Sequence, residues 1–220
     1  MMILVSAHLD DAVLSCGDLV WQFPGSLVLT VFAGRDVDWA ELREWDAATG
    51  FTPGTDVMAA RIAEDDCALA LLGGTARRLD FLDEQYREPE IDPPPEVVGR
   101  EIAALVREVG ADKVLFPLGI GHWDHQITAQ AAAYAATNLP DREWYAYQDL
   151  PYGYEYEPEV DRALAALADW NPVPVQLAVT SDLDRKNAAL DQYPSQMTGL
   201  GEKRRADALK PERYWALSPR

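Results

Sequence analysis

Cysteine is almost absent from this 220-residue sequence, which contains only Cys16 and Cys67. Two cysteines are too few for the disulfide framework of a small secreted domain. Both fall in stretches with the apolar spacing of helices, so we interpret them as small core residues. No apolar run approaches the roughly 20 residues that cross a bilayer. Met1 and Met2 lead into the first apolar run without a basic leader, so the sequence predicts a cytoplasmic protein.

Basic residues are also scarce, because 19 Lys and Arg stand against 37 Asp and Glu, a formal net charge of −18. Such a surface repels phosphate backbones, so neither nucleic acid nor an anionic membrane is an expected partner. Solubility alone would also explain the charge. With 48% hydrophobic residues the chain can bury a full core, and we expect residues 1–220 to form one domain that acts on a small molecule. A homo-oligomer is compatible with this composition.

Histidine is the third scarce residue, and all three histidines lie in two short stretches. The first stretch follows an apolar run at residues 1–5, which is typical of a buried parallel strand. It places His8, Asp10 and Asp11 directly before an apolar-periodic helix at residues 12–20. Ligands of open α/β sheets bind where strands end and helices begin, and imidazole with carboxylate is a Zn²⁺ ligand set.

The second stretch follows another strand-like run and contains the other two histidines, at residues 119–125. Simpler interpretations of the first stretch remain open. Asp10 or Asp11 can cap the helix, which is the commonest reason for an aspartate at this position. His8 can be a hydrogen-bonded histidine at a strand end. Scattered structural histidines would not be expected to gather in two strand-end segments with aspartates, so the grouping favours a metal site.

These residues resemble the two motifs of the LmbE/PIG-L family of zinc-dependent N-deacetylases. The first family motif is Ala-His-Pro-Asp-Asp-Glu, which residues 7–12 match with Leu9 in place of Pro and Ala12 in place of Glu. The second is His-x-Asp-His, which residues 122–125 match in full. Neither replaced residue is a metal ligand or the base in this family. The resemblance implies a hydrolase that removes an N-acetyl group from an amino-sugar-containing small molecule, such as a GlcNAc derivative.

Strands that alternate with helices indicate an α/β fold, a Rossmann-like, mostly parallel sheet with helices on both faces and strand order 3-2-1-4-5, followed by a C-terminal strand and helices. The predicted strands are residues 1–5, 26–34, 78–82, 113–117, 143–147 and 173–180, and the predicted helices are residues 12–20, 56–72, 96–109 and 126–136. Strands one and four are then neighbours, which brings the two histidine stretches together. His8, Asp11 and His125 are the expected ligands of Zn²⁺, or of another divalent metal such as Fe²⁺, with positions left open for water and substrate.

The resemblance also implies the catalytic residues. Asp10 would accept the proton of the attacking water, which the metal ion activates. Protonated His122 would stabilise the oxyanion that forms on the acetamide carbonyl. Asp124 would keep His122 charged and oriented, unless it only caps the helix that starts there.

Arg61 and Asp83 are the expected substrate-binding residues, and both assignments rest on the resemblance. Arg61 lies in a pattern similar to the second helix of the family, where the arginine reaches the sugar; an intrahelical pair of Arg61 with Asp65 is the alternative. Asp83 follows the third predicted strand, in a place similar to a substrate-binding aspartate of the family. Together with the acidic surface, these residues favour a neutral or weakly charged sugar that bears an N-acetyl group.

Three further segments have an expected place near the site. Residues 35–55 form either a wall over the metal site or a packed surface loop. The tyrosine-rich residues 150–158 supply either aromatic faces for a sugar ring or ordinary packing contacts. Residues 186–196 resemble the C-terminal signature of the family, which seats the last helix near the site and places Gln196 nearest the chemistry.

Three rival functions have to be weighed. A dinucleotide-binding domain is disfavoured, because the turn after the first strand is not glycine-rich and its two carboxylates would repel a pyrophosphate. A non-catalytic metal-binding relative is suggested by Leu9 and Ala12, but the other motif residues are intact. An amidase of the same family that cleaves another amide, such as a thiol–sugar conjugate, would use identical chemistry, so the sequence leaves it open.

Overall fold

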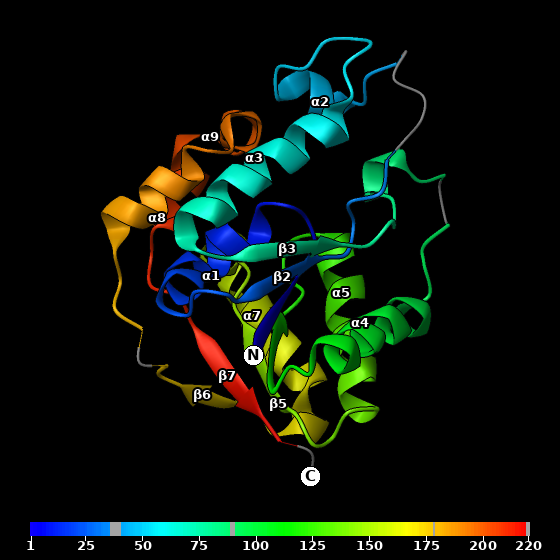
Figure 1. Cartoon of the computed structure of the whole chain (residues 1–220), viewed down its shortest axis with the longest axis vertical. Helices are drawn as coiled ribbons and strands as arrows, with labels where there is room; N and C mark the ends of the chain where they lie inside the picture. Colours follow the sequence, from blue (N-terminus) through cyan, green and yellow to red (C-terminus); the bar gives the residue numbers. More distant parts are fainter. Residues whose placement is uncertain (36–40, 89–90, 178, 219–220) are drawn as a thin grey trace.

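A single mixed sheet forms the centre of the computed structural model, which describes residues 1–35, 41–88, 91–177 and 179–218. Its order is β3-β2-β1-β4-β5-β7-β6 (Figure 1). Strands β1 to β5 pair in parallel, whereas β7 pairs antiparallel with both β5 and β6. The strands are β1 Met2–Ser6, β2 Leu27–Thr30, β3 Thr75–Arg78, β4 Lys113–Pro117, β5 Glu143–Tyr147, β6 Val173–Val175 and β7 Tyr214–Leu217. The predicted α/β class and the order 3-2-1-4-5 are confirmed.

Helices cover both faces of the sheet, as predicted (Figure 1). One face is covered by α1 Asp11–Gln22, α3 Val57–Leu72, α8 Leu183–Leu190 and α9 Pro194–Ala208, and the other by α4 Pro95–Val109, α5 Trp123–Thr137 and α7 Glu157–Ala166. The connections contain the short helices α2 Glu44–Ala48 and α6 Tyr152–Glu155 and the 3-10 turns η1 Glu84–Tyr86 and η2 Ala168–Trp170. No helix in the described residues is long and apolar enough to cross a membrane.

The central strand β1 is buried on both faces, which explains its unbroken apolar sequence. Ile3 and Val5 belong to the core on the α4 and α5 side, whereas Leu4 belongs to the core on the α1 and α3 side. At the end of the strand, the hydroxyl of Ser6 accepts a hydrogen bond from the backbone N–H of Ala12 in α1. The turn between strand and helix is thereby fixed at the carboxyl edge of the sheet, where the first histidine stretch lies.

The third strand lies earlier in the sequence than predicted. Helix α3 ends at Leu72, and the next residue, Gly73, has a φ of 74° in the left-handed region, so the chain turns there directly toward β2. The backbone N–H of Thr75 already donates to Ser26, so β3 pairs over Thr75–Arg78 rather than over residues 78–82. The apolar residues that suggested the later strand, Leu79 and Phe81, instead pack against the core on the α4 side.

Five further features differ from the prediction, four of them in the C-terminal half. Strand β6 is shorter than predicted, and β7, which the sequence reading missed, lies between β5 and β6. Residues 150–158 form α6 and the start of α7 rather than a loop. Helix α5 begins at Trp123, so its first turn includes part of the second histidine stretch. In helix α3, Cys67 is exposed and is not a core residue, whereas Cys16 in α1 is buried as expected.

Candidate metal centre and active site

The two histidine stretches meet at the carboxyl edge of β1 and β4, which pair directly in the sheet. The ring centroids of His8 and His125 are 5.3 Å apart, and His122 lies 4.8 Å from His8 and 5.7 Å from His125. The predicted convergence of the two segments is therefore what the fold produces. It follows from the strand order, because neighbouring parallel strands end at the same edge.

Three side chains present ligand atoms to one point. Oδ2 of Asp11 lies 3.3 Å from Nδ1 of His8 and 3.1 Å from Nε2 of His125. The three ligand atoms all lie within 4.8 Å of one another. Nε2 of His125 is buried, and its one close polar neighbour among the described residues is the carboxylate of Asp11, with which it forms no well-aligned hydrogen bond, as expected for two atoms that a metal ion would engage together. This donor set fits a divalent ion such as Zn²⁺.

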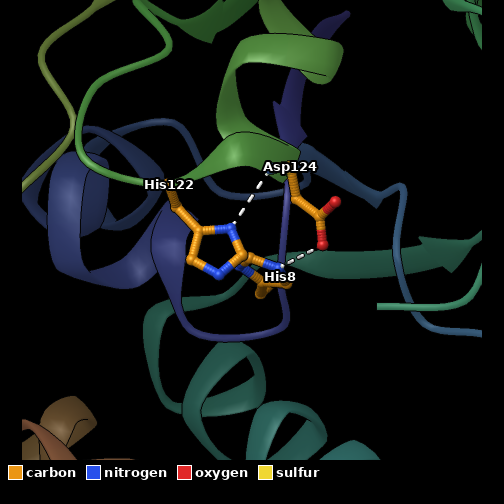
Figure 2. A group of neighbouring side chains, drawn as sticks. All are labelled: His8, His122 and Asp124. Atoms are coloured by element: carbon orange, nitrogen blue, oxygen red, sulfur yellow. Dashed lines mark hydrogen bonds and ion pairs between the residues drawn. The ribbon is translucent and has the colours of Figure 1, made fainter. Parts of the chain in front are cut away.

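A second group of possible ligands shares one histidine with the first. His8, His122 and Asp124 also offer atoms within 4.8 Å of one another (Figure 2). In this group His8 is approached through its other ring nitrogen, since Nε2 lies 3.1 Å from Oδ2 of Asp124. One neutral imidazole has a single lone-pair nitrogen, so the two groups are alternatives for one ion at His8.

The other ring nitrogen of His125 is held by Asp149, which the sequence reading did not identify. Nδ1 of His125 lies 2.7 Å from Oδ1 of Asp149, and both residues are buried. Oδ2 of Asp149 accepts hydrogen bonds from the backbone N–H groups of Gly119 and Ile120. A carboxylate behind a ligand histidine fixes its tautomer and orientation. The available signal was an aspartate two residues after β5, at the same edge of the sheet.

Neighbouring carboxylates set the protonation of both candidate ligand histidines. Burial alone would lower the pKa of His125, but Asp11 and Asp149 raise it to about 10. Burial would also lower the pKa of His8, yet its contacts with Asp11 and Asp124 raise it well above the usual 6.5. The surroundings thus favour positive charge between these side chains, which a divalent cation would also provide.

The aspartate pair of the first stretch does not cap helix α1. Asp10 occupies the N-cap position, but its side chain makes no capping hydrogen bond. Oδ2 of Asp11 accepts from the backbone N–H of His8, which lies before the helix. The capping alternative is therefore wrong for both side chains. Burial, followed by the charge of Asp11, raises the pKa of Asp10 to about 7, and Asp10 lines the pocket beside the ligand group.

His122 and Asp124 are arranged differently from the expectation. Nδ1 of His122 accepts a hydrogen bond from the backbone N–H of Asp124, whereas the carboxylate of Asp124 contacts His8 instead (Figure 2). Burial, followed by the nearby His8 and His125, lowers the pKa of His122 to about 4. The expected protonated form of His122 is therefore disfavoured. Because Nδ1 accepts, the neutral ring has its proton on Nε2.

A pocket of about 410 Å³ opens beside these residues. Its lining includes the catalytic candidates His8, Asp10, Asp11 and His122, the predicted substrate residues Arg61 and Asp83, and Leu9, Leu14, Phe32, Trp45, Met58, Glu84, Gln85, Tyr152, Gln196 and Leu200. His125 and Asp124 lie behind this surface and are buried. The structure therefore brings all eight predicted site residues into one region.

The charge of Arg61 is satisfied within the protein. Its guanidinium lies 2.7 Å from Oδ1 of Asp46, and Oδ2 of Asp46 accepts from the Tyr86 hydroxyl. The alternative pair with Asp65 is wrong, because Asp65 is paired with Arg78 on β3. Arg61 is only 5% exposed, so it forms part of the pocket wall together with its aspartate.

Residues 35–55 and residues 150–158 both reach the pocket. Trp45 of the 35–55 segment lines it and packs where a Cβ on Gly199 would lie, so this segment contributes a wall; its residues 36–40 lie outside the described residues. Tyr152 places its ring edge-on to His125 with centroids 5.5 Å apart. Trp45 and Tyr152, from segments far apart in the sequence, therefore both add aromatic surface to a pocket that Phe32 also lines.

The C-terminal segment is fixed to the site by hydrogen bonds. The hydroxyl of Tyr193 donates toward the backbone oxygen of Leu9, in the turn that contains His8. The Ser195 hydroxyl and backbone N–H both bind the carboxylate of Glu64 on α3. These contacts hold the start of α9 against the pocket, and Gln196 is on its lining.

We compared the chain with known protein families and proteins. Residues 3–136 match the family model described as PIG-L, GlcNAc-PI de-N-acetylase. A 2'-N-acetylparomamine deacetylase of Streptomyces fradiae is 33% identical over 179 residues, which cover 74% of this chain and 61% of the relative. The matched part is thus less than two thirds of the relative's length.

Solved structures resemble the whole chain. A triple mutant of a deacetylase from the teicoplanin biosynthetic pathway aligns with a TM-score of 0.81 and 26% identity, covering 100% of this chain and 98% of that chain. A 4-carboxy-2-hydroxymuconate hydratase from Pseudomonas putida KT2440 aligns with a TM-score of 0.63 and 20% identity over 100% of this chain and 96% of that chain. At that identity only the fold is shared, and the fold alone does not determine the reaction.

Proposed function

The chain belongs to the PIG-L family, and from this premise we propose that it is a metal-dependent hydrolase that removes an N-acetyl group from an amino-sugar-containing small molecule. The observation that carries the proposal is the convergence of His8, Asp11 and His125 on one point beside the pocket, with Asp10 next to them. Residues 1–220 would act as one domain, and the substrate would be a GlcNAc-type derivative.

The ligand group fits Zn²⁺, and Fe²⁺ is compatible with the same nitrogen and oxygen donors. When bound, such an ion polarises a carbonyl oxygen and lowers the pKa of water. The protein would hold it through His8 and His125, each backed by a carboxylate, and through Asp11. This leaves the pocket side open, as a catalytic site requires.

Asp10 is proposed as the general base. Its carboxylate is not engaged in helix capping, and a pKa near 7 suits a group that takes up a proton at neutral pH. It lies on the pocket surface next to Asp11, so a water molecule between substrate and ligand group would be within its reach. Asp10 would later return the proton to the amine that leaves.

His122 is proposed to stabilise the oxyanion as a neutral donor. The hydrogen bond to Nδ1 leaves Nε2–H as the donating group of the ring, and His122 lines the pocket. A neutral imidazole that is already oriented needs no reorganisation when negative charge develops on the carbonyl oxygen. Asp124 would contribute indirectly, by orienting His8 rather than by charging His122.

The pocket supports a sugar as the substrate. A volume of about 410 Å³ is within the range of small-molecule sites. Trp45 and Tyr152 supply aromatic surface, whereas Asp83 and Gln196 supply groups that bind hydroxyls. Arg61 would act as a wall residue. An amidase that acts on a thiol–sugar conjugate would use the same residues. Which amide bond the enzyme cleaves therefore has to be determined by experiment.

Acetate release from a panel of N-acetylated amino sugars tests the proposal, with metal-loaded wild type and Asp10→Asn compared at equal metal content. We expect release by the wild type and a large loss in the variant. If the loaded wild type releases acetate from no member of the panel but cleaves another amide, the amidase is the correct function. If it cleaves no amide, the hydrolase proposal is wrong.

A further inference from the structure

Arg87 makes a set of contacts that none of the assigned roles uses. It follows η1, and its side chain is only 7% exposed. Its Nη2 lies 2.7 Å from Oδ1 of Asp124 and 3.0 Å from Oδ1 of Asp92, and its Nη1 donates to the backbone oxygen of Leu82 at 2.8 Å. The guanidinium also lies over the Phe32 ring, 5.2 Å from its centroid. The position of Arg87 is therefore fixed on every side.

Asp124 connects Arg87 to the proposed metal centre. Oδ1 of Asp124 binds Arg87, and Oδ2 accepts the backbone N–H of Glu84 at 2.9 Å. Oδ2 also lies 3.1 Å from Nε2 of His8 (Figure 2). The side chain of Asp124 is fully buried. Nδ1 of His8 then faces Asp11. A continuous chain of contacts runs from Arg87 through Asp124 to the proposed ligand nitrogen.

The two candidate ligand histidines are supported in different ways. Asp149, behind His125, is held by two backbone N–H groups at the end of β4. Asp124, behind His8, depends on a cationic side chain from the segment after β3. A buried carboxylate without a cation is costly. Nη2 of Arg87 pairs with Oδ1 of Asp124 while Nη1 is anchored on the backbone oxygen of Leu82, so the planar guanidinium both compensates the charge of this carboxylate and holds its Oδ1 in place.

We propose that Arg87 is a positioning residue for metal binding, which fixes Asp124 so that His8 presents Nδ1 to the ion. The inference rests on the proposed function, because it takes His8, Asp11 and His125 as the ligands. It also links the metal centre to the pocket, since Asp83, Glu84 and Gln85 on the lining belong to the same short segment as Arg87.

The test is the dissociation constant for Zn²⁺, measured by competition with a chromogenic chelator on metal-stripped protein. Arg87→Met retains the apolar stem over Phe32 and removes the fork. We expect Zn²⁺ binding to weaken by about 10–100-fold, the range typical of lost support behind a ligand histidine. At saturating Zn²⁺ the kcat should fall much less than the affinity. Arg87→Lys retains the charge and should restore part of the affinity.

Two matched control variants show whether weaker Zn²⁺ binding follows from loss of the Arg87–Asp124 contact or from loss of any ion pair. Asp92→Asn weakens the outer partner of Arg87 and leaves the contact with Asp124. Arg205→Gln removes an arginine that is bound to Asp191 and Asn187 between α8 and α9 and does not line the pocket. Both variants should bind Zn²⁺ within about twofold of the wild type, whereas comparable weakening in either control would overturn the proposal.

A double-mutant cycle with Asp124→Asn tests the path through Asp124. If Arg87 acts through this carboxylate, replacing it should change Zn²⁺ affinity far less in the Asp124→Asn background than in the wild type. Independent effects, or wild-type affinity in a folded Arg87→Met, would overturn the inference while leaving the ligand group intact. If Arg87→Met does not fold, Arg87→Lys in the same cycle gives the answer. A wild type that binds no divalent ion would overturn the metal centre itself.

Discussion

Asp10 and Asp11 are neighbours in sequence, yet their surroundings differ in a way that separates their roles. Asp11 lies between two imidazoles, so Asp11→Asn should weaken metal binding because a neutral amide is a poorer ligand. Asp10 contacts neither imidazole, so Asp10→Asn should retain the metal and lose about 10²–10⁴-fold in kcat with little change in KM. Metal content and kinetics of both variants check this. Equal metal loss in the two would place Asp10 among the ligands.

His122 distinguishes the two alternative ligand groups. If the ion binds to His8, Asp11 and His125, His122→Ala should keep its metal and lose about 10²–10³-fold in kcat, because a donor to the oxyanion is removed. Metal analysis and kinetics of this variant give the answer. His122→Gln, which retains an N–H donor, is the control and should lose less. Loss of the metal in His122→Ala would locate the ion at His8, His122 and Asp124 instead.

For single residues, the sequence identified which side chains belong to the site better than it identified their contacts. All three histidines could be found because histidine is rare in this chain and the three follow two buried strands, and the aspartates could be found because they lie beside them. The partner of Asp124 could not be found, since His122 is its neighbour in sequence but His8 is its neighbour in space. Asp149 was missed because its partner His125 is distant in sequence and because a single aspartate after a strand has no motif around it.

Among the elements, strands β1, β4 and β5 were predicted to within one residue, whereas β3 and β7 were not. The three strands that were predicted well contain apolar residues that are buried by their neighbours on the two sides. Strand β3 is at the edge, and only alternate residues are partly covered. Strand β7 has only four residues and is stabilised by antiparallel pairing with β5 and β6. Its residue Tyr214 faces Tyr147 of β5, which lies 67 residues earlier in the sequence. Local pattern contains no information on such pairings.

Asp65 ties helix α3 to the edge strand and to the start of α9, and its pKa makes this junction sensitive to pH. Burial raises the pKa of Asp65 to about 6, although Arg78 and the Tyr193 hydroxyl lower it. Because the folded state binds the proton more tightly than the unfolded chain, the contribution of Asp65 to stability should rise as pH falls from about 7 toward 4. This is the opposite of the usual behaviour of a paired carboxylate.

The free energy of unfolding of wild type and Asp65→Asn, measured across this pH range, isolates the effect. The wild type should gain stability relative to the variant as pH falls through about 6, and the difference should level off near pH 4. Other carboxylates titrate in both proteins and cancel in the comparison. A difference that is independent of pH, or that shrinks on acidification, would show that Arg78 rather than burial controls the titration.

Over the whole molecule, the charge distribution favours a positive charge on the substrate. The chain has a formal charge of −18, and the pocket lining includes Asp83 and Glu84. Among the described residues neither carboxylate is paired with a lysine or arginine, and the Glu84 side chain is 51% exposed at the pocket. Arg61, the arginine on the lining, is neutralised by Asp46, and the charge of a divalent ion at the proposed site would be balanced by Asp10 and Asp11 on the same lining. We therefore expect the substrate to be a sugar that carries a protonated amine, rather than a neutral sugar.

The 2-aminoethyl and 2-hydroxyethyl glycosides of GlcNAc differ in one charge and test this preference. At low ionic strength kcat/KM should be about 10-fold higher for the amine, because an acidic pocket concentrates cations. Raising the ionic strength from about 0.01 M to about 1 M shortens the screening length from about 30 Å to about 3 Å, so most of the preference should disappear. Glu84→Gln should reduce the preference for the amine at low salt, judged by the ratio of the two kcat/KM values, because Glu84 lies 3.6 Å from Nε2 of His122 and an effect on that residue would cancel in the ratio. Equal kcat/KM for the two glycosides would mean that the acidic charge serves solubility and does not select the substrate.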